Sequence, residues 1–129
     1  MKRNLFFIIS ALLAWVFGIM MIFLPDSMAA GATPGINIGM QWFGIALVSV
    51  GVINFLSRND PGSKALTAVM IGNIFLHLAG GAADIYDYTQ GTVQLSSILM
   101  PGLVHLLMIV GFVYFLFKKE KGGTIEKIV

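Results

Sequence analysis

The sequence predicts an all-α membrane protein, an antiparallel bundle of four transmembrane helices with both termini in the cytoplasm. Three observations support this fold class. Four long apolar stretches follow one another, each close to the ~20 residues that a helix needs to cross a ~30 Å hydrocarbon layer. Of all residues, 57% are hydrophobic and 11% are charged, which leaves too little polar surface for a soluble protein. Finally, the basic residues occur only in alternate connections.

The apolar stretches predict helices over residues 4–24, 38–56, 65–86 and 95–117 of a single membrane domain, residues 1–129. They are apolar on all sides, whereas the strands of a membrane barrel alternate between apolar and polar residues. Because a helix satisfies its backbone hydrogen bonds within one segment, helices are expected here. The second and third connections are short, and short connections make consecutive helices antiparallel neighbours.

The distribution of charge predicts the orientation in the membrane. The basic residues are Lys2, Arg3, Arg58, Lys64, Lys118, Lys119, Lys121 and Lys127. The connection between the first and second helices contains Asp26, and the connection between the third and fourth contains Asp87, but neither has a basic residue. Since cytoplasmic loops retain Lys and Arg, the termini and the middle connection are predicted to lie in the cytoplasm. The net charge of +2 then anchors the chain to the anionic leaflet of the lipid bilayer and does not indicate nucleic-acid binding.

The connections carry local signals of their own. The first, residues 25–37, is rich in Ala, Gly and Pro, and is compatible with a lid over the helix ends or with a plain connector. The middle one contains the turn sequence Asn59-Asp60-Pro61-Gly62, and Ser63 after it is expected to cap the third helix. The polar tail after Phe117 is expected to be frayed.

Composition excludes several kinds of chemistry. The chain has no cysteine, so disulfide exchange, iron–sulfur clusters and thiolate zinc sites are excluded. No set of nucleophile, base and orienting residue can be assembled from the available side chains. The sequence therefore predicts no catalytic residue, and we do not expect an enzyme.

The third span carries the most informative pattern. Asn73, His77, Gly80 and Asp84 follow one another at helical spacing, so they lie on one face, which polarity directs away from lipid. His77 is nine residues from Tyr86, or roughly 13 Å along a helix. His105 of the fourth span lies at a similar depth, roughly 16 Å from the start of its helix. We therefore expect the two histidines to share one site.

Three interpretations of the histidines remain open. The imidazoles could hydrogen-bond to each other, to Asn73 or to a carbonyl and so hold the helices together. Each such hydrogen bond would stabilise helix association by ~0.6 to 2 kcal/mol. They could line a polar pocket open to the outer face, with Asp84 at its mouth. They could also hold a haem or a metal ion, which the ~8–10 Å spacing of neighbouring helices disfavours within one protomer but not between the protomers of a homodimer. No metal or cofactor is predicted.

Further residues near the same level could extend such a pocket. Pro101 removes a donor from the fourth span and is expected to bend it. The small residues Gly80 and Gly81 allow either close helix packing or room for a ligand. Gln41 is an amide whose exposure to lipid would be costly, and Trp15 carries an indole N–H near mid-membrane that needs a partner.

The chain resembles the DoxX-like small bacterial membrane proteins and a related four-helix family. The likeness lies in the segments Met21-Ile22-Phe23-Leu24-Pro25-Asp26, Gln41-Trp42-Phe43-Gly44 and His77-Leu78-Ala79-Gly80-Gly81-Ala82-Ala83-Asp84, and in His105. The resemblance implies a four-helix bundle in the inner membrane of a bacterium, associated with quinone or redox-stress contexts, and it implies no catalytic residue.

These observations lead to two functional hypotheses. In the first, the protein binds a small lipophilic molecule, quinone- or lipid-like, in an outward-facing cavity. The lining would be His77, His105, Asp84, Asn73, Gln41 and Trp15. In the second, it is a non-catalytic partner subunit or assembly factor, and the histidines only hold helices together.

Overall fold

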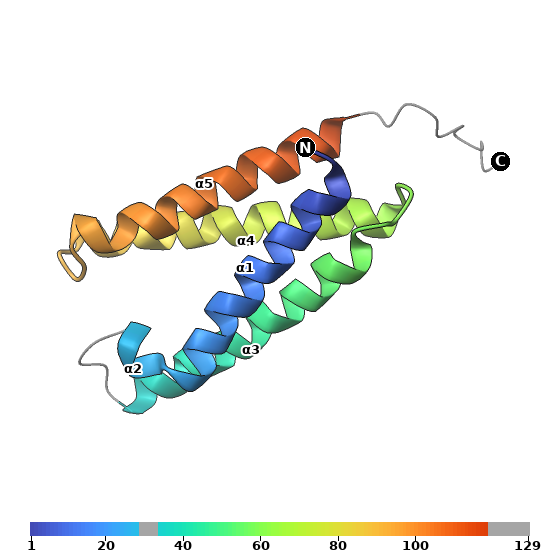
Figure 1. Ribbon diagram of the computed structural model, residues 1–129. Coiled ribbons are helices and arrows are strands. Elements are labelled where there is room, and N and C mark those ends of the chain that lie inside the picture. The colour runs from blue at the N-terminus through green and yellow to red at the C-terminus, as the bar shows by residue number, and fades with distance from the viewer. Residues whose placement is uncertain (29–33, 119–129) are drawn as a thin grey trace. The chain divides into compact units, whose positions relative to one another are not determined.

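The computed structural model describes residues 1–28 and 34–118, and all of its regular structure there is helical (Figure 1). The helices are α1 (Arg3–Phe23), α2 (Pro25–Met28), α3 (Pro34–Ser57), α4 (Lys64–Thr89) and α5 (Leu95–Phe117). Among the described residues, four helices are long and apolar enough to cross a membrane, namely α1, α3, α4 and α5. The prediction of an all-α chain with four membrane-length helices is therefore confirmed for this part of the chain.

The helix boundaries lie within a few residues of those expected, with two differences. Helix α3 begins at Pro34, because the fixed φ of proline suits the first residue of a helix and its missing N–H is not needed there. For the same reason a single unexpected turn, α2, begins at Pro25. The expected lid or connector at residues 29–33 and the tail beyond residue 118 lie outside the described residues.

The helices group into two compact units, residues Met1–Asn59 and Asp60–Val129. In the first unit α1 packs beside α3, and in the second α4 packs beside α5 (Figure 1). We call these the first and the second hairpin, and each is described by itself.

In the first hairpin the two helix backbones approach each other closely through glycine. A Cβ placed on Gly44 would lie 2.6 Å from the carbonyl oxygen of Gly18, and a Cβ on Gly18 would lie 2.7 Å from that of Gly44. Small residues at membrane-helix contacts allow this close approach. Nearer the start of α1, the Asn54 side-chain amide donates to Ser10 Oγ at 3.0 Å, and both side chains are buried. The two helices are thus joined by backbone contact and by an internal polar pair.

The middle connection folds as its sequence predicted. One oxygen of the Asp60 carboxylate accepts hydrogen bonds from the backbone N–H groups of Gly62 and Ser63, at 2.8 and 2.9 Å. Gly62 has a φ of 114°, which favours glycine. Ser63 is the N-cap of α4, and its Oγ accepts from the backbone N–H of Leu66 at 3.0 Å. The predicted cap is confirmed.

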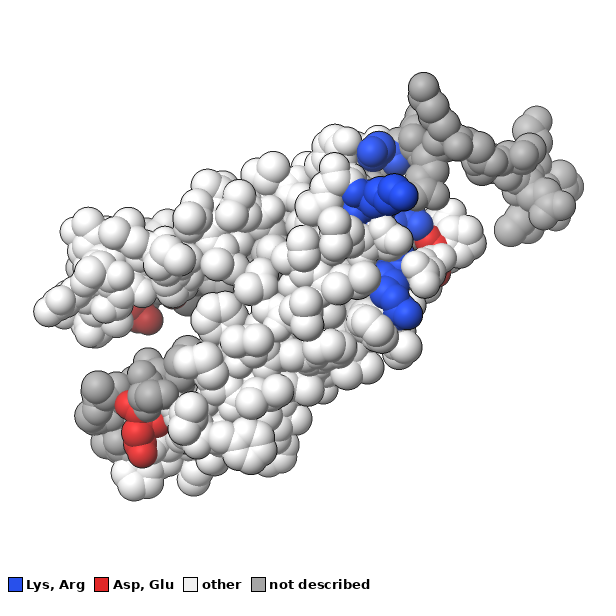
Figure 2. All heavy atoms as spheres, viewed as in Figure 1, with Lys and Arg blue, Asp and Glu red and all other residues white. Residues whose placement is uncertain are grey.

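The basic side chains described in each hairpin lie at the ends of its helices. Lys2 precedes α1 and Arg58 follows α3, whereas Asp26 lies in α2 at the opposite end of the same hairpin. In the second hairpin Lys64 opens α4 and Lys118 follows α5. Figure 2 shows the blue basic side chains at helix ends and long stretches of white surface between charged ends. The lengths of the helices are compatible with a lipid environment.

Candidate functional site

Helices α4 and α5 bring the two histidines together within the second hairpin. His77 is 13 residues from the start of α4 at Lys64 and 12 from its end at Thr89, so it lies at the middle of that helix. His77 Nδ1 and His105 Nδ1 are 3.0 Å apart, and the ring centroids are 5.3 Å apart. In such a contact one nitrogen donates its proton and the other accepts, so at least one ring is neutral. The equal depth of the two residues had predicted this meeting.

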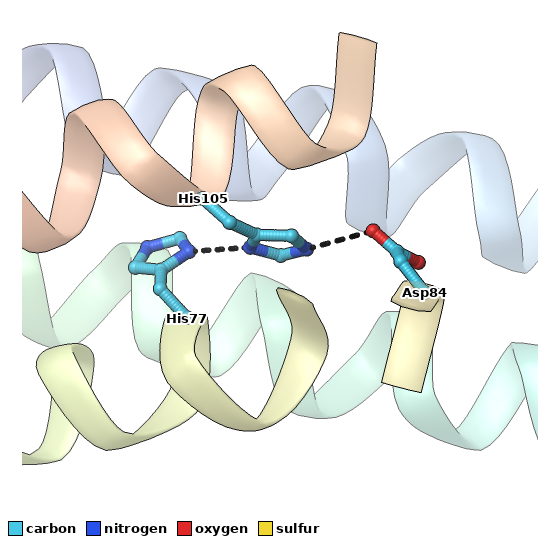
Figure 3. Close-up of polar contacts among 3 residues, drawn as sticks. All are labelled: His77, Asp84 and His105. Atoms are coloured by element: carbon cyan, nitrogen blue, oxygen red, sulfur yellow. Dashed lines mark hydrogen bonds and ion pairs between the residues drawn. The ribbon is translucent and has the colours of Figure 1, made fainter. Parts of the chain in front are cut away.

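Asp84 extends the pair into a row of three titratable groups (Figure 3). Its Oδ2 lies 3.8 Å from His105 Nε2, on the side of the ring away from His77. Oδ2 is buried and has no hydrogen-bond partner within the described part of the chain. The His105 and Asp84 side chains as a whole keep 24% and 29% of their area exposed, so both are only partly covered within this hairpin.

Gly80 provides the space that the His105 ring occupies. A Cβ on Gly80 would lie 2.7 Å from His105 Cε1 and 2.8 Å from Nε2, far inside van der Waals contact. At Gly81 an added Cβ would be 3.7 Å from His105 Cβ, an ordinary contact. The glycine pair was expected to allow either close helix packing or room for a ligand. In this hairpin Gly80 allows the His105 imidazole of the neighbouring helix to pack closely against α4.

One further residue of the site was missed by the sequence analysis. The Phe112 ring stacks on His77, with centroids 6.3 Å apart and an angle of 21° between the ring planes, and it is fully buried. Phe112 follows His105 by seven residues, which places both on one face of α5. This spacing is a signal that could have identified it.

The other predicted lining residue of this hairpin bonds to its own helix. The Asn73 side-chain amide donates to the carbonyl oxygen of Val69, one turn earlier in α4, at 2.8 Å. Its side chain is buried, one turn from His77 on the same face. Pro101 lies inside α5, which continues through it to Phe117.

Gln41 and Trp15 belong to the first hairpin, where each has a contact of its own. The Gln41 amide donates to the carbonyl oxygen of Ile22, near the end of α1, at 3.2 Å. The indole of Trp15 covers Gly51, where an added Cβ would lie 2.6 Å from Nε1, and its ring lies 5.5 Å from that of Phe55. The structure thus places these two side chains in the packing of α1 against α3.

The geometry of the His pair bears on the metal interpretation. A metal joining two imidazole nitrogens end to end separates them by roughly 4 Å, twice an ordinary metal–nitrogen bond. The 3.0 Å between the Nδ1 atoms is shorter, so within this hairpin the nitrogens bind each other. Across the described residues, no group of three or more His, Cys, Asp or Glu side chains is placed to hold a metal ion.

The chain matches no protein-family model, no curated protein and no solved structure. Function is therefore inferred from the geometry of the row.

Proposed function

We propose that this protein is an integral membrane protein that binds a small lipophilic molecule through a polar head group at His77, His105 and Asp84. The class of ligand is quinone- or lipid-like, with an oxygen-bearing head and an apolar body. The apolar surface of helices α4 and α5 suits the body of such a molecule, and the row suits its head.

The observation that carries this proposal is the unused hydrogen-bonding capacity of the row. Asp84 Oδ2 is buried without a hydrogen-bond partner, and His77 Nε2 has no partner among the described residues either. A buried polar atom without a partner costs about 1–3 kcal/mol. A head group hydrogen-bonded to Asp84 at one end of the row, or to His77 Nε2 at the other, makes use of this capacity.

A second function is favoured by a different observation. The Nδ1 atoms bind each other, and Gly80 is shaped to the His105 ring, as in a contact that only joins two helices. In that case the protein is a non-catalytic partner subunit or assembly factor. The two functions differ in what substitution of the histidines removes, a ligand in the first and helix association alone in the second.

Lipid extraction and mass spectrometry of the protein purified in nanodiscs tests the proposal. We expect a lipophilic molecule to co-purify with the wild type and to fall about tenfold in His77→Ala and His105→Ala, the effect of one lost hydrogen bond. Thr67→Ala is the control, because Thr67 lies in α4 and bonds only to its own helix, at Ser63 O. Equal recovery from all variants would refute ligand binding at the row.

The topology and the family belong to the same proposal. Alternating basic connections support four antiparallel passes through a bacterial inner membrane with both termini in the cytoplasm. The segments around His77 and Gln41 support a place among the DoxX-like proteins.

A further inference from the structure

The three groups of the row lie in sequence along the second hairpin. His77 is at the middle of α4, and Asp84 is seven residues closer to its end at Thr89, or roughly 10 Å along the axis. The imidazole of His105 lies between them and faces one with each of its nitrogens (Figure 3). The connection that follows Thr89 contains no Lys or Arg, so by the proposed topology it lies outside.

We propose that Asp84, His105 and His77 form a proton relay between the outer membrane surface and the head group of the bound molecule. This inference rests on the proposed function, because the ligand is the proton acceptor at the inner end. It requires a head group with a deprotonated oxygen that can take up the proton without any electron transfer, as the phenolate form of a quinol does. Imidazole suits a relay because one nitrogen can accept a proton while the other releases one.

Each step can be written atom by atom. The O–H bond of protonated Asp84 breaks, and a bond forms between that proton and His105 Nε2. The N–H bond at His105 Nδ1 breaks, and its proton passes to His77 Nδ1 across the 3.0 Å contact. His77 then releases its Nε2 proton to the ligand oxygen. One proton enters the row, one leaves it, and no electron moves. Before a second proton can pass in the same direction, both imidazoles must return to their starting tautomers.

One gap in the row must close for the relay to operate. The 3.8 Å between His105 Nε2 and Asp84 Oδ2 exceeds a hydrogen bond. A small movement of the partly exposed carboxylate closes it, or one water bridges it. The 3.0 Å contact between the imidazoles is already within range.

No other titratable group of this hairpin enters the row. The remaining ones described in α4, α5 and their ends are Asp60, Lys64, Tyr86, Asp87, Tyr88, Tyr114 and Lys118. None of them hydrogen-bonds or pairs with either imidazole among the described contacts. Within the hairpin, Asp84 is therefore the one described group placed to supply His105.

Nitrogen-15 NMR of histidine-labelled protein in nanodiscs, stripped of lipid ligand, measures the exchange of imidazole N–H protons with water. We expect Asp84→Asn and His105→Gln to slow exchange at His77 about 100-fold, the usual worth of a positioned proton-transfer group. Glutamine retains hydrogen bonding but cannot pass a proton through its side chain, so a structural role would be rescued by it. Asp87→Asn, outside the row, is the control and should not change the rate.

The outcomes separate the relay from ligand binding. Unchanged exchange at His77 in Asp84→Asn, with the contact between the two rings still visible in the spectrum, would overturn the relay. This holds even if His105→Gln fails to fold, since Asp84→Asn leaves both rings in place. Because the protein is measured without ligand, absence of a co-purified lipophilic molecule would refute the proposed function while leaving the proton path itself measured.

Discussion

At the level of single residues, the site depends on a hydrogen bond between like atoms, Nδ1 of His77 and Nδ1 of His105. Like nitrogens can bond only when the two rings differ in which atom carries the proton. An ionised Asp84 beside Nε2 of His105 favours a proton on that nitrogen, which leaves the Nδ1 of the same ring able to accept from His77. This is the arrangement that remains after one proton has passed along the proposed relay. The carboxylate thereby selects the tautomer of a ring that it does not quite touch.

The strength of this bond can be measured with a double-mutant cycle. We expect His77→Ala and His105→Ala each to destabilise the protein, and the double variant to lose less than the sum. Polar contacts between membrane helices are worth ~0.6 to 2 kcal/mol, which is the coupling energy expected here. Unfolding in detergent, followed by circular dichroism, gives the four free energies. Simple additivity would contradict a direct bond between the rings.

The fit of His105 against Gly80 gives a second prediction. Gly80→Ala places a methyl 2.7 Å from His105 Cε1, so the ring must leave its position. Forcing an extra carbon into a close contact costs about 1–3 kcal/mol. Detergent unfolding should show this loss, and the His77 and His105 NMR signals should shift together.

Gly72→Ala is the matched control for that substitution. Gly72 lies in the same helix and has no other atom within 4 Å of an added Cβ. Alanine favours helix over glycine by about 1 kcal/mol, so this variant should be as stable as the wild type or more so. If both variants change the free energy of unfolding alike, the effect of Gly80→Ala comes from helix propensity, and the close contact between Gly80 and the His105 ring does not contribute to stability.

At the level of helices, the two hairpins are joined in different ways. In the first, glycine backbones meet directly at Gly18 and Gly44, and the polar contact between Asn54 and Ser10 is internal. In the second, the glycine makes room for a titratable side chain instead. The proposed ligand site lies in the second hairpin because the side chains at its helix contact are titratable.

The contact between α1 and α3 can be tested by the same comparison. Gly44→Ala puts a methyl 2.6 Å from the Gly18 carbonyl oxygen, a backbone atom that cannot turn aside. We expect a loss of about 1–3 kcal/mol in detergent unfolding. Gly39→Ala, one turn or so earlier in α3 with no atom within 4 Å, should cause none. A stable Gly44→Ala protein would mean that the two helices separate at little cost.

Local signals explain how much of this could be predicted from the sequence. The four spans, the Asp60 turn and the Ser63 cap depend on neighbouring residues, and the structure shows each of them. Depth along a helix placed His77 and His105 at one level for the same reason. Which atoms meet depends on side-chain rotamers and on the rotation of each helix about its axis, and neither follows from residue spacing alone.

The neighbours of Gln41 and Trp15 could not be predicted from their depth in the membrane. Their depth suggested a shared lining, but depth does not say toward which neighbour a side chain points. Gln41 bonds to the end of α1, and Trp15 covers Gly51 beside Phe55, within the first hairpin. Gln41 thereby gains a hydrogen-bond partner, whereas the contacts described for Trp15 are packing contacts.

For the whole molecule, the orientation in the membrane decides from which side the proposed relay would receive protons. In the proposed topology the α4–α5 connection lies outside and the α3–α4 connection inside. The chain has no cysteine, so single cysteines introduced at exposed positions report topology without background. Asn59 and Gln90 are both exposed, one in each of these connections.

We expect a maleimide that cannot cross membranes to label Gln90→Cys in intact cells, and Asn59→Cys only after the cells are permeabilised. The physical reason is that Arg58 and Lys64, on either side of Asn59, are retained in the cytoplasm, whereas the connection at Gln90 has only an acidic neighbour. Labelling of both variants after permeabilisation is the control for reactivity. The reverse pattern would put Asp84 at the cytoplasmic end of α4, and the relay would then draw its protons from inside the cell.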